Sequence, residues 1–110
     1  TWPDRAPTGL APLDFGRLRQ LDFEAPREDV FPSLRLAREA GEKCGTLPAV
    51  FNAANEVAVE RFVAGTLSFP GIARLVESVM QEHEVVASPD LDTILAADAE
   101  ARVLAARRDL

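Results

Sequence analysis

The stretch LPAVFNAANEVAVERF, residues 47–62, constrains the fold more than any other part of the chain. Its apolar residues recur every three or four positions, which is the spacing of an α-helix. On a wheel of about 100° per residue, Asn52, Asn55 and Glu56 occupy only about a quarter of the circle, and two valines share that side. A helix that is apolar nearly all round is usually central in its domain or docked on a partner.

The helix before this stretch is predicted from its borders. It follows Asp29 and has Pro32 in its first turn, a position that proline favours. It is expected to stop at Gly41 or Gly45, because glycine commonly ends helices. Its predicted apolar stripe consists of Leu34, Ala37 and Ala40.

Caps and breakers also border the central helix and the one after it. The central helix is expected to run from Thr46, an N-cap, to Gly65, a C-cap. The next helix has Ser68 near its cap and Pro70 in its first turn. It has the cleanest amphipathic pattern in the chain, with a stripe of Ile72, Leu75, Val76, Val79 and Met80.

The last helix is expected to begin at Ser88-Pro89-Asp90, with acidic residues in the first turn where the helix dipole favours them. Its predicted apolar face consists of Leu91, Ile94 and Leu95. Asp98 lies one turn further along this stripe, and a lone buried carboxylate is costly. We therefore expect a break or bend at Asp98, which would cap a second segment that runs through Ala101, Leu104 and Ala105 to the end.

Residues 1–28 have a different character. Three prolines and a glycine exclude a helix over residues 1–12. The segment QLDFEAP, residues 20–26, alternates apolar and charged residues, as a short edge strand or an extended arm would. The prediction is an extended, Pro-rich linker and arm over residues 1–28, followed by an all-α, four-helix bundle over residues 29–110.

Size and charge exclude several classes of protein. The 110 residues suffice for one modest domain. A net charge of −6 with scattered arginines argues against a nucleic-acid partner, which would need a basic face. No apolar run approaches the roughly 20 residues of a membrane span. Cys44 is the only cysteine, so no intrachain disulfide can form, which fits a reducing, cytoplasmic setting.

The candidate functional residues are Asn52, Asn55 and Glu56, the polar groups of the central helix. The favoured interpretation is structural: the amides bond neighbouring backbone, and Glu56 pairs with an arginine. Contact with another domain is the second interpretation, and a ligand or catalytic role is the third. Two asparagines and a glutamate lack the spacing of a metal site and contain no activated nucleophile.

The remaining candidates also favour structural interpretations. His83, the only histidine, suits a helix-end charge better than a ligand. Cys44 suits a structural thiol better than a reactive one. Four acidic residues could resemble a metal site, but their positions suit the first turns of helices better: Asp90, Asp92, Asp98 and Glu100. No catalytic, cofactor-binding or metal-binding residue is predicted.

A resemblance to a known family rests on long segments in a fixed order. PAVFNAANEVAVERFVAGTLSF is the most specific of them, at residues 48–69. Three others flank it: WPDRAPTGLAPLDF, LDFEAPREDVFPSLRLAREAG and LDTILAADAEARVLA. Together they make nearly the whole chain resemble the C-terminal part of 1-deoxy-D-xylulose 5-phosphate reductoisomerase. Val30 and the turn Lys43-Cys44-Gly45 depart from the family pattern, which affects local detail only.

The resemblance implies a structural domain of a larger enzyme. In this family an N-terminal NADPH-binding Rossmann domain and a central catalytic domain precede a C-terminal helical bundle. The family's enzymes use NADPH and a divalent metal, Mg or Mn, for an isomerisation and a reduction to 2-C-methyl-D-erythritol 4-phosphate in non-mevalonate isoprenoid biosynthesis. Their metal-binding and substrate-binding residues lie before the segment that matches this chain, so none is assigned here.

Several expectations follow from the resemblance. The chain alone should be inactive, and its partners should be the missing N-terminal NADPH-binding and catalytic domains of the same polypeptide. Asn52, Asn55 and Glu56 should tie the central helix to the linker or to the neighbouring domain. Some self-association is expected, because an isolated bundle exposes the face that docks elsewhere. The alternative function is a free-standing helical interaction module derived from the same family.

Overall fold

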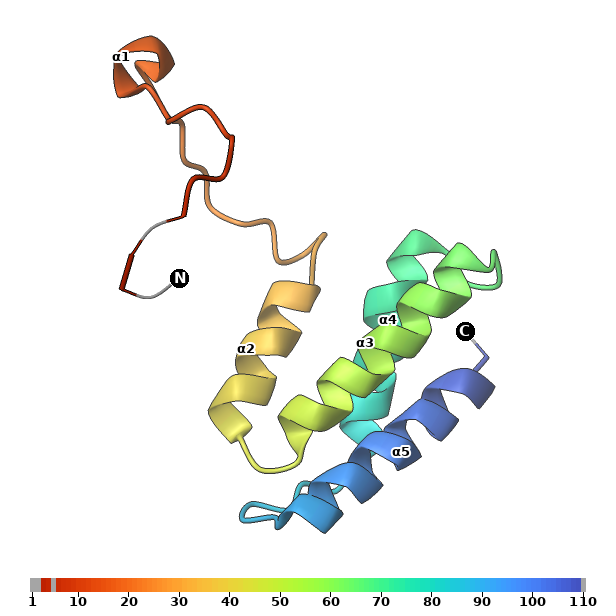
Figure 1. Ribbon diagram of the computed structural model, residues 1–110. Coiled ribbons are helices and arrows are strands. Elements are labelled where there is room, and N and C mark those ends of the chain that lie inside the picture. Colours follow the sequence, from red (N-terminus) through yellow and green to blue (C-terminus); the bar gives the residue numbers. More distant parts are fainter. Residues whose placement is uncertain (1–2, 5, 110) are drawn as a thin grey trace.

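The computed structural model describes residues 3–4 and 6–109, and all regular structure within them is helical (Figure 1). This confirms the all-α prediction. Segment 20–26 is extended and is not paired into a strand in this part of the chain. The helices are α1 (Phe15–Leu18), α2 (Ser33–Lys43), α3 (Leu47–Val63), α4 (Phe69–Glu82) and α5 (Leu91–Arg107).

Helix α3 lies at the centre of the bundle, as its composition predicted. It packs against α2, α4 and α5, while α4 also touches α5 (Figure 1). Ala53, Ala54 and Ala58 of α3 are fully buried, and small side chains allow neighbouring helices to approach closely. The core therefore follows the length of α3.

Helix α4 also confirms its prediction. The Ser68 side chain accepts a hydrogen bond from the Gly71 backbone N–H at 3.2 Å, which satisfies one of the free donors at the helix start. Proline occupies the first turn. The predicted stripe faces the core: Leu75, Val76, Val79 and Met80 are buried and Ile72 is partly buried.

Helix α5 differs from its prediction in two ways. Leu91 and Leu95 are 68% and 58% exposed, so they do not form the core face. Ala101 and Ala105 are buried and Leu104 is partly buried, which confirms the residues expected for the second segment, and Ala97 is also buried. The expected break is also wrong, because α5 runs without interruption. Asp98 does not lie on the buried side, so its carboxylate needs no break to remain partly in solvent. The prediction for the start of the helix followed the bulkier apolar side chains, whereas in the structure α5 packs closely on α3 through alanines.

Helix α2 corrects the sequence prediction at its face and at its end. Leu34 is half exposed, while Leu36 and Ala40 are the residues buried against the core. The helix continues past Gly41 to Lys43, and Cys44 follows with a positive φ of 55°. A non-glycine residue with positive φ is uncommon and marks a tight reversal of the chain.

The turn into α3 shows that Thr46 is an anchor and not the expected cap. Its backbone is already helical, and its side chain makes no capping bond. The hydroxyl instead accepts a hydrogen bond from the Val86 N–H at 3.1 Å, and the Thr46 N–H donates to the Val86 carbonyl at 3.1 Å. These bonds hold the turn between α2 and α3 against the loop between α4 and α5.

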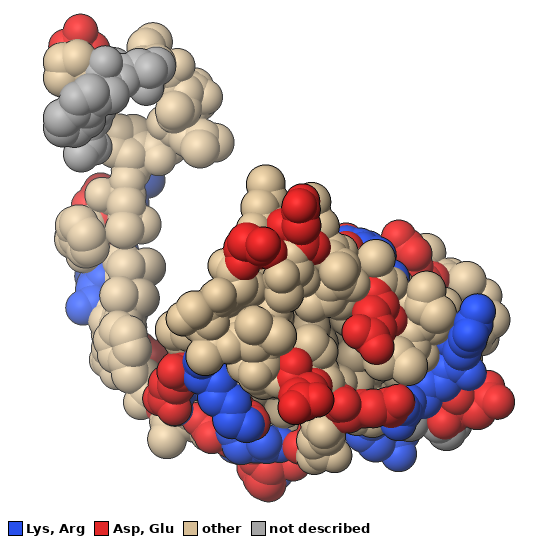
Figure 2. Space-filling model, turned by 90° about the horizontal axis from the view of Figure 1, so that it is seen from below, with Lys and Arg blue, Asp and Glu red and all other residues tan. Residues whose placement is uncertain are grey.

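The chain before α2 stands clear of the bundle (Figure 1). Figure 2, which views the molecule from below, shows this arm with mostly uncharged residues, while acidic and basic side chains are interspersed over the bundle. No helix among the described residues is long and apolar enough to span a bilayer.

Candidate functional site: a polar network between α3 and α5

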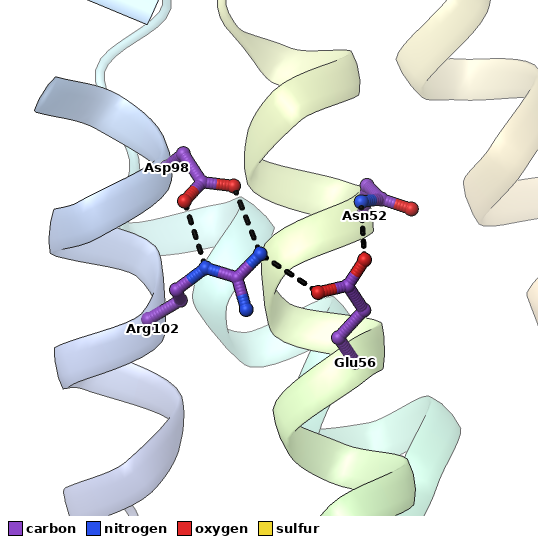
Figure 3. A network of polar contacts seen from close by, with 4 residues as sticks. All are labelled: Asn52, Glu56, Asp98 and Arg102. Carbon is purple, nitrogen blue, oxygen red and sulfur yellow. Dashed lines mark hydrogen bonds and ion pairs between the residues drawn. The ribbon is translucent and has the colours of Figure 1, made fainter. Parts of the chain in front are cut away.

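The polar residues of α3 form part of a network that reaches α5 (Figure 3). Asn52 and Glu56 lie one turn apart, so the Asn52 Nδ2 donates to Glu56 Oε1 at 3.0 Å. The second carboxylate oxygen of Glu56 accepts from Arg102 Nη2 of α5 at 2.7 Å. Arg102 in turn holds Asp98 through two bonds, Nε to Oδ2 at 2.7 Å and Nη2 to Oδ1 at 3.3 Å.

Arg102 is the positive charge that both carboxylates of the network share. Its hydrogen bonds with Asp98 and then Glu56 raise the pKa of the guanidinium further above its ordinary value. The bond from Arg102, followed by the bond from Asn52, lowers the pKa of the Glu56 carboxyl. All of these side chains remain partly in solvent, which screens their attraction and limits its contribution to stability.

This arrangement joins α3 to α5 through paired charges. The guanidinium pairs with both carboxylates. Because the pKa of the Glu56 carboxyl is lowered, it lies further below neutral pH than that of an ordinary glutamate, and this makes Glu56 a poor general base. The interpretation that Glu56 pairs with an arginine agrees with the structure. Asn52 bonds Glu56 and not the backbone that was expected.

Asn55 is separate from the network. It is partly buried, and its side chain makes no hydrogen bond within the described part of the chain. Near it on the same side of α3, Val59 is 42% and Val63 is 79% exposed. We call Asn52, Asn55, Val59 and Val63 the open face of α3.

His83 lies at the end of α4, where the sequence indicated a helix-end role. Its Nε2 is 2.7 Å from the hydroxyl of the buried Thr46, so it contributes to the same junction that Thr46 anchors. Asp90 caps α5 by accepting from the Thr93 N–H at 2.8 Å. Hydrogen bonding with the Thr93 side chain, and then with its backbone N–H, lowers the pKa of the Asp90 carboxyl. The Cys44 thiol is exposed and lies 3.0 Å from the Gly41 carbonyl oxygen.

The sequence reasoning missed the role of Arg61. From near the end of α3 its Nη1 donates to the carbonyl oxygens of Ala105 and Arg108, each at 2.7 Å. These are free acceptors at the end of α5, so the guanidinium caps that helix from a neighbouring one. Nothing in the sequence distinguishes Arg61 from the other arginines, because its partners are more than 40 residues away.

A hollow of about 460 Å³ lies among α3, α4, α5 and the α4–α5 loop. Its apolar lining includes Val50, Val79 and Leu104, and three glutamates also border it: Glu82, Glu84 and Glu100. Over residues 3–4 and 6–109, no three His, Cys, Asp or Glu side chains are grouped so that they could hold a metal ion.

The polar network predicts a pH-dependent effect of Glu56→Gln. The pKa of Glu56 is lower in the folded state than in the unfolded state. Its carboxylate therefore stabilises the fold fully at a pH above the unfolded-state pKa of about 4.3, and this stabilisation is lost as the pH falls through the folded-state pKa. We expect Glu56→Gln to have a lower urea midpoint than the unmodified chain at pH 7. The two midpoints should converge as the pH falls below the ordinary range of glutamate.

The matched control is Glu60→Gln, on the same helix and exposed, with no ion pair inside the described segments. This variant should track the unmodified chain at every pH. A difference for Glu56→Gln that widens on acidification would contradict the assigned ion pair.

Comparisons with known proteins cover nearly the whole chain. A family model described as the DXP reductoisomerase C-terminal domain matches residues 1–104. The 1-deoxy-D-xylulose 5-phosphate reductoisomerase of Pseudomonas putida is 52% identical over 103 residues, and that of Pseudomonas syringae is 51% identical over 104 residues. In both cases the match covers 94% of this chain and 26% of the relative.

A solved structure supports the same comparison. The reductoisomerase from Zymomonas mobilis in complex with NADPH aligns with a TM-score of 0.81 and 44% sequence identity. The alignment covers 96% of this chain and 28% of that one. The chain therefore spans about a quarter of the length of the proteins that it matches.

Proposed function

This chain belongs to the family of DXP reductoisomerase C-terminal domains, and from that premise we propose that it serves as the helical C-terminal domain of a longer, NADPH-dependent reductoisomerase. The observation that carries the proposal is the difference in coverage. Nearly all of this chain matches about one quarter of each relative, so the matched proteins contain a large part that this chain does not.

In the proposal, the longer polypeptide isomerises 1-deoxy-D-xylulose 5-phosphate and reduces the product with NADPH, for isoprenoid biosynthesis in the cytoplasm. NADPH and a divalent metal, Mg or Mn, would be held by the preceding domains. The Zymomonas mobilis relative, whose structure contains NADPH, supports the cofactor. Residues 1–28 would connect the catalytic domain to the bundle of residues 29–110.

Within residues 3–4 and 6–109, the side chains do not fit a divalent metal or NADPH. The described residues lack a cluster that could hold a metal ion. The hollow beside α4 and α5 is bordered by three glutamates, whose charges would repel the phosphates of a dinucleotide. No catalytic step is therefore assigned to this chain, and its role in the proposal is structural.

The open face of α3 is the surface we assign to the preceding domain. Helix α3 has α2, α4 and α5 as its neighbours (Figure 1), and Val59 and Val63 of the open face remain exposed. The valines supply apolar area, and Asn55 has both donors and acceptors for a partner's backbone. The network of Arg102 would hold α5 beside this face and keep its shape constant. Without its neighbour, the same face would promote self-association of the isolated chain.

The proposal is tested by measuring the mass of the native polypeptide that contains these helices. We expect it to be several times larger than the 11.9 kDa of the 110 residues.

A further inference from the structure

The arm before α2 exposes an unusual amount of apolar surface. Among its described residues, the larger apolar side chains are at least 38% exposed: Leu10 81%, Leu13 65%, Phe15 72%, Leu18 38%, Leu21 58%, Phe23 88%, Val30 48% and Phe31 57%. An apolar surface of this extent on a soluble domain usually marks a contact with another protein part. Figure 2 shows that the arm stands away from the bundle, so the bundle does not supply this contact.

The segment Gln20–Ala25 has the pattern of a strand without a sheet. Leu21 and Phe23 alternate with Asp22 and Glu24, so an extended backbone places the apolar pair on one face and the charged pair on the other. No backbone hydrogen bond is made by residues 21–25 within the described chain. Unpaired N–H and C=O groups along an extended segment are what a sheet edge binds.

The borders of this segment limit its length. Arg19 precedes it with a positive φ of 59°, a turn that separates the segment from α1. Pro26 follows it and cannot donate a backbone hydrogen bond, so pairing ends there. Phe15, Leu18 and Leu21 line one hollow of about 230 Å³, so the apolar side of α1 is continuous with that of the segment.

Three surfaces could receive the segment. The bundle has no strand among its described residues and therefore offers no edge. A second copy would pair arm with arm, which places the carboxylates of Asp22 and Glu24 near those of the partner, and like charges on opposed strands are destabilising. The remaining surface is the preceding part of the same polypeptide, which in the relatives accounts for about three quarters of the length.

We propose that residues 20–25 add as an edge strand to a β-sheet of the preceding part of the same polypeptide, an inference that rests on the proposed function. Leu21 and Phe23 would be buried on that sheet, and Asp22 and Glu24 would remain in solvent. The connection to the bundle would then be a fixed strand and not a flexible tether, so the bundle would keep one orientation relative to the preceding domains.

Residue-resolved hydrogen exchange on the native-length polypeptide tests the strand, with the 110-residue chain as reference. An edge strand uses every second N–H, so protection should alternate. Either Asp22 and Glu24, or Leu21, Phe23 and Ala25, should exchange at least about 100-fold more slowly than in the reference. Uniform protection would indicate burial without strand pairing, and exchange as fast as in the reference would mean no contact. Either result overturns the inference.

A pair of double variants tests the role of the apolar face. Leu21→Asp with Phe23→Asp should restore fast exchange, whereas Asp22→Asn with Glu24→Gln changes the charged face and should keep the protection. Protection that survives the first double variant would also overturn the inference. A native polypeptide near 11.9 kDa would instead contradict the proposed function itself. A long polypeptide with an unprotected arm would contradict only the strand.

Discussion

Gly45→Ala is expected to destabilise the bundle by about 3–5 kcal/mol, a large fraction of the roughly 5–15 kcal/mol available to a small domain. Gly45 has a φ of 60°, a left-handed conformation that costs an L-residue about 1–2 kcal/mol. A Cβ at this position would also collide with the Val86 carbonyl oxygen and lie 3.0 Å from the carbonyl carbon. The loop would have to move, and the two hydrogen bonds between Thr46 and Val86 contribute about 1 kcal/mol each.

Two other glycines provide controls that separate strain from collision. Gly65 has a φ of 75° with open space around it, so Gly65→Ala should cost only the strain of about 1–2 kcal/mol. Gly41 lies inside α2 with nothing near a Cβ, so Gly41→Ala should stabilise by about 0.5–1 kcal/mol. Urea unfolding followed by circular dichroism measures all three. If Gly45→Ala cost no more than Gly65→Ala, the contact between the α2–α3 turn and the α4–α5 loop would be wrong.

Leu75→Ala is expected to cost about 2–5 kcal/mol, because its fully buried side chain would leave a cavity in the core. Leu95→Ala removes the same atoms from a side chain that is 58% exposed and should change stability by no more than about 0.5 kcal/mol. Urea midpoints at constant slope would give both values.

This pair also tests which side of α5 faces the core. The apolar face expected for the first turns of the helix would make Leu95 a core residue, whereas in the structure the buried residues of α5 are Ala97 and the two alanines expected further along, Ala101 and Ala105. Equal losses for the two variants would contradict the alanine face of α5.

The sequence predicted α4 well because several independent signals coincide there. Ser68 is a strong cap, a proline fits the first turn, and the bulky apolar residues from Ile72 to Met80 face the core. In α5 these signals conflict, because alanines form most of the contact surface while Leu91 and Leu95 are exposed. Side-chain size gives the wrong face whenever close helix packing requires small residues.

For the polar contacts, the sequence predicted the type of partner but not the particular residue. A glutamate on a largely apolar helix suggested an arginine partner. Arg102 lies 46 residues further along the chain, and local sequence patterns do not identify partners at that separation. The anchor role of Thr46 was hidden for the same reason, because its partner Val86 lies in another loop. Both residues are placed by tertiary packing.

Physical reasoning from residues led to a helical bundle without catalytic groups and could not identify the larger protein to which such a bundle would belong. The long matching segments supplied that step, because their order and spacing are specific to one family. The two lines agree on a helical bundle, and the matching segments identify it with the C-terminal part of longer relatives.

The intact mass of the native protein, captured from its source cells with an antibody against α4, shows whether this bundle is one domain of a longer polypeptide. We expect a polypeptide several times larger than 11.9 kDa whose C-terminal peptides match this chain. The recombinant 110-residue chain, added to the same lysate, controls for proteolysis during capture. A native product near 11.9 kDa, with the added chain recovered intact, would contradict the claim that this bundle works as one domain of a larger reductoisomerase.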